Sequence, residues 1–136
     1  MYQLEMTVND QHIDFQGIMD GLYYPFYMEE CRHKYIKEVL GVDIVEYAKN
    51  GLNLVLSEYN LKFKSSIKKD DALVVNCDLL ISECGKIKFA FKQQILVNNK
   101  VMADGVFFGT CVSSSGGRPF IPKEILQYIE KTSNSL

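Results

Sequence analysis

The chain has 136 residues, of which 47% are hydrophobic and 24% are charged. This length and composition predict a single globular domain over residues 1–136, because two domains of ordinary size would need a longer chain. Fifteen basic and 17 acidic side chains give a formal charge of −2. That balance disfavours a nucleic-acid partner, since binding to phosphates favours a basic surface.

The apolar stretches are too short to predict a membrane span. The longest runs from Val101 to Val112 and contains Asp104, and it falls short of the about 20 residues that a spanning helix needs. The opening segment carries Glu5 and no basic residue, which is unlike a signal peptide. We therefore expect a soluble cytoplasmic protein.

The four cysteines stand far apart, without a CxxC pair or a histidine at metal-binding spacing. We expect free thiols and no metal site. Cys31, Cys77 and Cys111 fall in apolar patterns, so we expect them in the core, where a thiol behaves as a small hydrophobic group.

The first predicted element is a strand over residues 2–8, where apolar and polar residues alternate. A polar loop follows, and Pro25 then marks the first turn of a helix that begins near Leu22 or Tyr23. Its apolar stripe consists of Tyr24, Met28, Cys31, Tyr35 and Val39. Gly41 is the stop signal, which gives an amphipathic helix of about 18 residues.

A weaker helical pattern over residues 42–49 is followed by a run of predicted antiparallel strands. Apolar and polar residues alternate over 55–63, 73–81 and 87–97, and an apolar run over 101–112 completes the set. The first of these strands is expected to bury Val55, Tyr59, Leu61 and Phe63 on one face. The pair Asn98-Asn99 predicts a tight hairpin turn with both residues at positive φ.

The C-terminal part predicts a loop over Ser113–Pro119 and then a short helix opened by Pro122. Ile125, Leu126 and Ile129 are expected to share one side of this helix. The order of elements predicts an α+β fold with a long helix laid across an antiparallel sheet. No βαβ unit is evident, which disfavours a doubly wound nucleotide-binding fold.

The polar residues that suggest chemistry gather in the loop before the long helix: Asp10, His12, Asp14, Gln16, Gly17, Asp20 and Gly21. Backbone N–H groups at a helix start bind an oxyanion or a polarised carbonyl. A carboxylate shortly before them could attack that carbonyl or activate a water molecule. The alternative is that Asp14 or Asp20 only caps the helix.

Two segments of this sequence carry a family resemblance: HIDFQGIMDGLYYPFYMEECR and SEYNLKFKSSIKKDDALVV. They resemble the hotdog-fold acyl-CoA thioesterases of the 4-hydroxybenzoyl-CoA thioesterase and Tol-Pal-associated type, over about residues 3–112. The matching motif positions are Asp14, Gly17, Tyr24, Glu29 and Arg32. The resemblance implies a hotdog fold, in which a five-stranded antiparallel sheet wraps a long central helix and a short C-terminal helix follows.

The resemblance also implies hydrolysis of an acyl-CoA, or of an acyl-carrier-protein thioester, to a carboxylic acid and a thiol. Asp14 would be the nucleophile or general base, and the backbone amide of Gly21 the oxyanion donor. Coenzyme A enters as part of the substrate, and no separate cofactor is expected. The implied assembly is a homodimer, often paired into a tetramer, with active sites at the subunit interface.

The candidate substrate-binding residues are Gly17, Leu22, Tyr24, His12 and Glu58. Three positions depart from the family pattern: His12 replaces an Asp, Gly21 replaces a His or Tyr, and Tyr23 replaces an Asn. Because Gly21 keeps its N–H, these departures affect acyl specificity more than the reaction. A basic row of Lys86, Lys88 and Lys92 either meets the 3'-phosphate of coenzyme A or is a solvated strand face.

Two other functions stay open on the same residues. The loop departures motivate a hotdog protein that binds acyl thioesters, or a partner, without turnover. A hotdog dehydratase would need a paired catalytic His and acid, and His12 is the only histidine of the loop, without the expected acid on the helix. We rank the dehydratase last.

Overall fold

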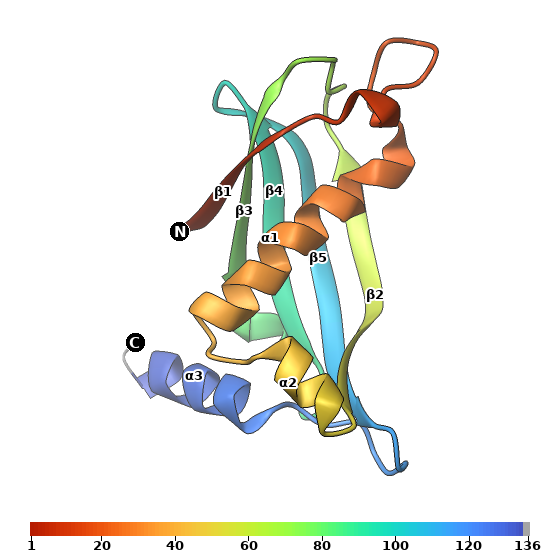
Figure 1. Ribbon diagram of the computed structural model, residues 1–136. Helices are drawn as coiled ribbons and strands as arrows, with labels where there is room; N and C mark the ends of the chain where they lie inside the picture. The colour runs from red at the N-terminus through yellow and green to blue at the C-terminus, as the bar shows by residue number, and fades with distance from the viewer. Residues whose placement is uncertain (135–136) are drawn as a thin grey trace.

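A five-stranded antiparallel sheet wraps one long helix in the computed structural model, which describes residues 1–134 (Figure 1). The strands are β1 (Tyr2–Thr7), β2 (Leu52–Phe63), β3 (Ala72–Leu79), β4 (Phe89–Val97) and β5 (Lys100–Ser113). Their spatial order is β1-β3-β4-β5-β2. The helices are α1 (Tyr24–Glu38), α2 (Ile44–Lys49) and α3 (Lys123–Asn134). The predicted α+β fold with a long central helix is confirmed.

Helix α1 begins one turn after Asp20. The Asp20 carboxylate accepts a hydrogen bond from the Leu22 N–H at 2.9 Å and caps a short 3-10 turn over Gly21–Tyr23, which leads into the helix. Pro25 lies in the first turn of α1 as predicted, where its missing N–H costs no helical hydrogen bond. Of the two carboxylates considered as helix caps, Asp20 caps this preceding turn, whereas the N-cap residue of α1 itself is Tyr23, whose side chain makes no capping hydrogen bond.

The buried face of α1 is wider than the predicted stripe. The predicted residues Tyr24, Met28, Cys31 and Tyr35 are buried, whereas Val39 is 37% exposed. Val39 follows the last helical residue, Glu38, so α1 has 15 residues and ends before this position. The wrapped sheet also buries Tyr27, Arg32 and Ile36, which lie beside the predicted stripe.

A bulge in the edge strand β2 divides the single apolar face predicted for it and separates Val55 from the later residues Tyr59, Leu61 and Phe63. The register with β5 shifts between Leu56 and Glu58, which leaves Ser57 unpaired. Such a bulge changes which side chains face the helix. Because no strand within residues 1–134 pairs with the outer edge of β2, Tyr59 remains 48% exposed and Phe63 57% exposed. The burial expected for this strand is therefore confirmed only in part: Leu61 packs against the core, whereas Val55, Tyr59 and Phe63 stay exposed within one chain.

The remaining strands follow the sequence patterns more closely. Asn98 and Asn99 have φ values of 50° and 64°, which confirms the tight β4–β5 turn. Strand β3 ends at Leu79 because the chain turns into a 3-10 segment over Ile81–Glu83. The region predicted to begin at residue 87 enters the sheet at Phe89.

The core lies between α1 and the sheet and contains three of the cysteines. Cys31, Cys77 and Cys111 are buried free thiols, as predicted. Burial raises the pKa of the Cys31 thiol to about 12. In α3 the predicted apolar side is confirmed in part, since Ile125 is buried but Leu126 is 47% exposed.

Helices α2 and α3 are joined by a hydrogen bond from the Tyr47 hydroxyl to the Glu124 carboxylate. Figure 1 shows both helices at the end of the sheet away from the loop that precedes α1. None of the helices described within residues 1–134 is long and apolar enough to cross a membrane.

Candidate active site

The loop before α1 folds back on itself as a small hairpin. The Asp20 N–H donates to the His12 carbonyl at 3.0 Å, and the Asp14 N–H donates to the Ile18 carbonyl at 2.9 Å. Gly17 forms the turn with a φ of 81°, a conformation that favours glycine. Asp14 therefore lies two residues beyond the His12–Asp20 pair at the base of the hairpin, a distance of about 7 Å in extended chain.

The Asp14 carboxylate is held by the hairpin and not by α1. One of its oxygens accepts a hydrogen bond from the Gln16 N–H at 2.8 Å. Among the described residues, the other oxygen has no hydrogen-bond partner, and the side chain is partly exposed. This carboxylate is free to meet a substrate or a water molecule.

Gly21 opens the turn into α1 and presents its backbone to the surface. Within residues 1–134 its N–H has no hydrogen-bond acceptor. One hollow beside Gly21 is lined also by Leu22, Pro25 and Phe63, and a second by Met19, Tyr24 and Phe63. Asp14 lines neither hollow. The structure therefore places the two predicted catalytic residues on one hairpin and helix junction without bringing them into contact.

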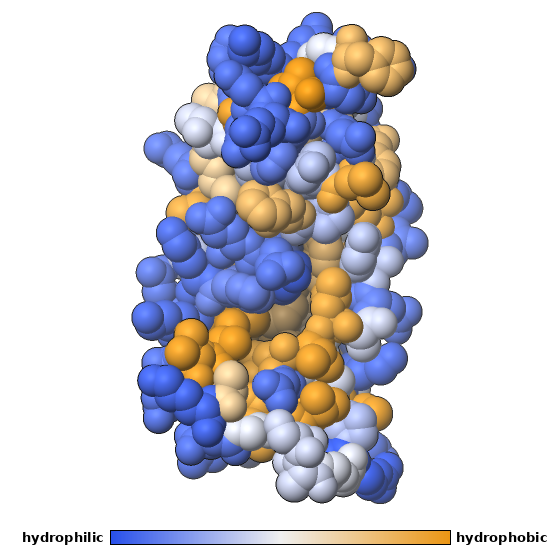
Figure 2. All heavy atoms as spheres, turned by 45° about the vertical axis from the view of Figure 1, so that its right-hand side comes forward, coloured by the Kyte–Doolittle hydropathy of each residue, from blue (hydrophilic) through white to orange (hydrophobic). Residues whose placement is uncertain are grey.

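Gly21 lies at one end of a groove between α1 and β2. The near end of the groove is lined by Leu22 and Pro25 with residues 59–61 of β2. The far end is a hollow of about 200 Å³ lined by Arg32 and Ile36 with residues 54–56. Figure 2 shows apolar side chains gathered along this face, with the surface hollowed between them.

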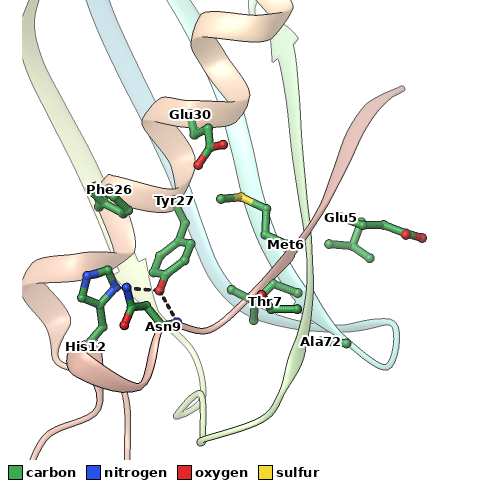
Figure 3. A pocket seen from close by; sticks show the side chains of 11 residues that line it. Glu5, Met6, Thr7, Asn9, His12, Phe26, Tyr27, Glu30 and Ala72 are labelled. Carbon is green, nitrogen blue, oxygen red and sulfur yellow. Dashed lines mark hydrogen bonds between the residues drawn. The ribbon is translucent and has the colours of Figure 1, made fainter.

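His12 belongs to a different hollow, between α1, β1 and β3 (Figure 3). Its Nδ1 lies 2.6 Å from the Tyr27 hydroxyl, which also accepts a hydrogen bond from the Asn9 N–H at 2.9 Å. The imidazole stacks on the Tyr23 ring with centroids 3.9 Å apart. His12 is thus fixed by aromatic neighbours, and the structure does not bring it to the hollows beside Gly21.

The other predicted substrate-binding residues fall in three settings. Leu22 is 82% exposed at the mouth of the groove, so it is available to an apolar ligand. Tyr24 is only 3% exposed, and its hydroxyl accepts a hydrogen bond from the Ile67 N–H at 3.3 Å. Burial raises the pKa of Tyr24. Gly17 shapes the hairpin turn and is exposed.

Glu58, Lys88 and Lys92 lie on the outer side of the sheet, whereas Lys86 lies in the exposed bend before β4. Glu58 forms an ion pair with Lys88, with 3.3 Å between the carboxylate and the ammonium nitrogen. Lys88 precedes Phe89, which is buried in the core under α1, and neighbouring strand residues point to opposite faces. Glu58 therefore lines neither end of the groove within one chain.

Arg32, predicted from the sequence only as a motif position, lines the far hollow and forms a buried polar pair with Gln93 that was not predicted. Arg32 is only 6% exposed, and its Nη1 donates to the Gln93 Oε1 at 2.9 Å. The guanidinium carbon lies 4.7 Å above the centre of the Phe107 ring. Burial lowers the pKa of Arg32 from its ordinary value. The burial of Gln93 could have been predicted, because it lies two residues from both Phe91 and Ile95 along the strand and so shares their core-facing side.

Comparisons with known proteins agree with this architecture. Residues 8–129 match the family described as the Thioesterase-like superfamily. The chloroplastic acyl-acyl carrier protein thioesterase ATL3 of Arabidopsis thaliana is 28% identical over 88 residues, which cover 65% of this chain and 46% of that protein. The match thus spans about half the length of the curated relatives.

Two solved structures are similar over almost the whole chain. A hypothetical protein of Aquifex aeolicus has a TM-score of 0.84 at 24% identity, and the match covers 95% of this chain and 99% of that protein. The DHNA-CoA thioesterase of Staphylococcus aureus has a TM-score of 0.84 at 17% identity, and the match covers 98% of this chain and 91% of that protein. At these identities the likeness shows the fold, which is the hotdog fold. The chain belongs to the Thioesterase-like superfamily.

Proposed function

We propose that this protein hydrolyses acyl thioesters of coenzyme A or of an acyl carrier protein. The observation that carries the proposal is the unpaired N–H of Gly21 at the head of α1, beside an apolar groove. Relatives named as acyl-acyl carrier protein and CoA thioesterases support the same reaction class. The loop motif favours the 4-hydroxybenzoyl-CoA and Tol-Pal-associated type within the superfamily.

In the proposed mechanism, the acyl group lies in the groove and its thioester carbonyl accepts a hydrogen bond from Gly21. A donor fixed in place stabilises the negative charge that develops on the carbonyl oxygen. Asp14 attacks the carbonyl carbon, or removes a proton from the water molecule that does. The C–S bond then breaks, and one water molecule per cycle gives a carboxylic acid and a free thiol.

The proposed active unit is a homodimer, and two such dimers are proposed to pair into a tetramer. An unpaired edge strand is a template for another strand, and β2 exposes Val55, Tyr59 and Phe63 on such an edge. Asp14 does not line either of the two hollows beside Gly21 within one chain. A second copy along β2 would complete the site by closing the groove from outside.

A second candidate is binding of acyl thioesters without turnover, which is favoured by the separation of Asp14 from the groove within one chain. The dehydratase is less well supported, because His12 contacts the Tyr27 hydroxyl and no carboxylate within the described residues.

The test is thiol release from a panel of acyl-CoA and acyl-carrier-protein thioesters, followed with a chromogenic thiol reagent. A blank without substrate corrects for protein thiols, of which Cys84 is the one that is not fully buried. Turnover on any member supports hydrolysis. Tight binding across the panel without thiol release would favour the binding protein instead.

A further inference from the structure

The two hollows between α1 and β2, one beside Gly21 and one at Arg32, follow one another along the same helix. On the helix side they are lined by Leu22 of the preceding 3-10 turn and by five residues of α1: Pro25, Glu29, Arg32, His33 and Ile36. Spacings of three and four residues place side chains on a single helix face. An acyl group whose thioester lies at Gly21 would therefore run along α1 toward Arg32.

Arg32 at the far end of the groove between α1 and β2 is a buried cation that forms no ion pair within residues 1–134. Its Nη1 donates to the neutral Gln93 amide, and its plane lies over Phe107. No carboxylate of residues 1–134 forms an ion pair with it within 4.0 Å. Glu29 attracts the guanidinium only from a longer distance, and one of its carboxylate oxygens lies 3.7 Å from the His33 Nε2. A buried charge is costly unless it is paired.

The guanidinium is also held in a fixed position. The Gln93 Nε2 donates to the Met28 carbonyl at 2.8 Å and to the Asn76 carbonyl at 3.3 Å. Because both amide hydrogens are used in this way, the Gln93 oxygen has to face Arg32. A cation fixed on rigid elements in a hollow with largely apolar walls is suited to recognising one ligand group.

We propose that Arg32 binds a carboxylate at the far end of the acyl chain, so that the enzyme selects ω-carboxyacyl thioesters. This inference rests on the proposed function. The guanidinium fork matches a carboxylate with two parallel hydrogen bonds. The apolar walls of the hollow, which include Phe89 and Phe91, lower the local dielectric constant and so strengthen that pairing.

The dimensions of the groove set the length of the acyl group. The hollow at Arg32 has about 200 Å³, which is below the roughly 300–1,000 Å³ of sites that hold a whole ligand. It therefore fits one end of a ligand. Gly21 and Tyr24 are separated by a three-residue 3-10 turn, which rises about 6 Å, and Tyr24 and Arg32 by eight residues of α1, which rise about 12 Å. An acyl group whose thioester lies at Gly21 therefore has to extend over about 18 Å, less the reach of the arginine side chain toward the start of the helix.

The experiment compares ω-carboxyacyl-CoA with methyl-ended acyl-CoA of equal chain length on the full chain. We expect the kcat/KM of wild type to be higher for the ω-carboxyacyl substrate by about ten-fold or more, which is the factor that about 1.4 kcal/mol of favourable pairing gives. Arg32→Met should abolish the preference. Arg32→Gln serves as a second variant that keeps a polar group toward Gln93. Lys34→Met, which removes an exposed cation from α1 outside the groove, should leave the preference unchanged.

Three outcomes overturn the inference: no preference in wild type, a preference that survives in a folded Arg32 variant, or an equal loss in Lys34→Met. Binding of non-hydrolysable thioether analogues, measured by calorimetry, separates this inference from the proposed reaction. A carboxylate preference in binding without hydrolysis would support the Arg32 site and contradict the thioesterase function. Hydrolysis without any preference for the carboxylate would support the thioesterase function and contradict the Arg32 site.

Discussion

Gly109 of β5 lies directly opposite Phe89 of β4, and a Cβ placed on Gly109 would come within 2.9 Å of the Phe89 ring. Leu56 of β2 is the other neighbour of Gly109 in the sheet. The missing side chain thus leaves room for the Phe89 ring where the hollow at Arg32 is formed. Glycine is required at this position by close packing and not by backbone conformation.

Gly109→Ala should destabilise the protein, because the Phe89 ring is 2% exposed and has little room to move. Overpacking of a core typically costs about 1–3 kcal/mol. Urea denaturation measures the change in the free energy of unfolding. Gly85→Ala is the matched control, since a Cβ there meets nothing within 4 Å. Equal stability of the two variants would contradict the packing argument.

Asp20 and Asp14 should separate into a structural and a chemical carboxylate. Asp20→Ala removes the hydrogen bond to the Leu22 N–H and should lower the free energy of unfolding by about 1 kcal/mol. Asp14→Asn keeps an oxygen for the Gln16 N–H and should leave stability within about 0.5 kcal/mol of wild type. Thermal or urea unfolding of both variants provides the comparison. A larger loss in Asp14→Asn than in Asp20→Ala would reverse these roles.

Stability should fall as pH rises above about 9 because of the buried thiols. The pKa of Cys31 is raised by burial from 9.0 to about 12, and burial also raises that of Cys77. Above pH 9 the unfolded chain releases thiol protons that the folded chain retains, so deprotonation favours unfolding. Below pH 9 both states keep these protons and the contribution is constant.

The measurement for the thiols is urea denaturation between pH 7 and about pH 10.5, in wild type and Cys31→Ala. The variant has a lower baseline because a core atom is lost, but its stability should depend less steeply on alkaline pH. The tyrosines titrate in both proteins and cancel in the comparison. Parallel pH profiles would show that Cys31 does not contribute.

We predict that copies of the chain associate with one another through the edge of β2. Tyr59→Lys places a charge on the inner apolar part of this edge, and edge lysines oppose strand pairing. We expect a shift from dimer or tetramer to monomer in light scattering, together with a loss of turnover. Lys62→Glu on the same strand is an exposed control that replaces one charge with another. A wild-type monomer with full activity would contradict the shared site.

The sequence patterns predicted the elements that depend on local residues. The stripe from Tyr24 to Tyr35, the Asn98-Asn99 turn and the Pro25 helix start all follow from periodicity or backbone preference, and the structure confirms them. The bulge at Ser57 was not predictable in this way. A bulge depends on how β2 fits β5, and no local pattern marks it.

The site was predictable only in part for a similar reason. The polar loop and the head of α1 were identified from residue types and spacing. The burial of Arg32 was not, because an arginine on a helix is usually exposed and its partner Gln93 lies 61 positions further along the chain. His12 was grouped with Gly21 by sequence distance, but the Tyr27 hydroxyl holds it in another hollow.

The most direct test of the proposed reaction is the kcat/KM of Asp14→Asn on the best acyl thioester, with Asp10→Asn as the control. Asp10 is an exposed carboxylate of the same loop and lines none of the hollows at Gly21 or Arg32. We predict that Asp14→Asn lowers kcat/KM by about 10²–10⁴-fold, the usual contribution of a catalytic acid or base, while Asp10→Asn stays near wild type. Turnover by folded Asp14→Asn equal to that of wild type would contradict the account.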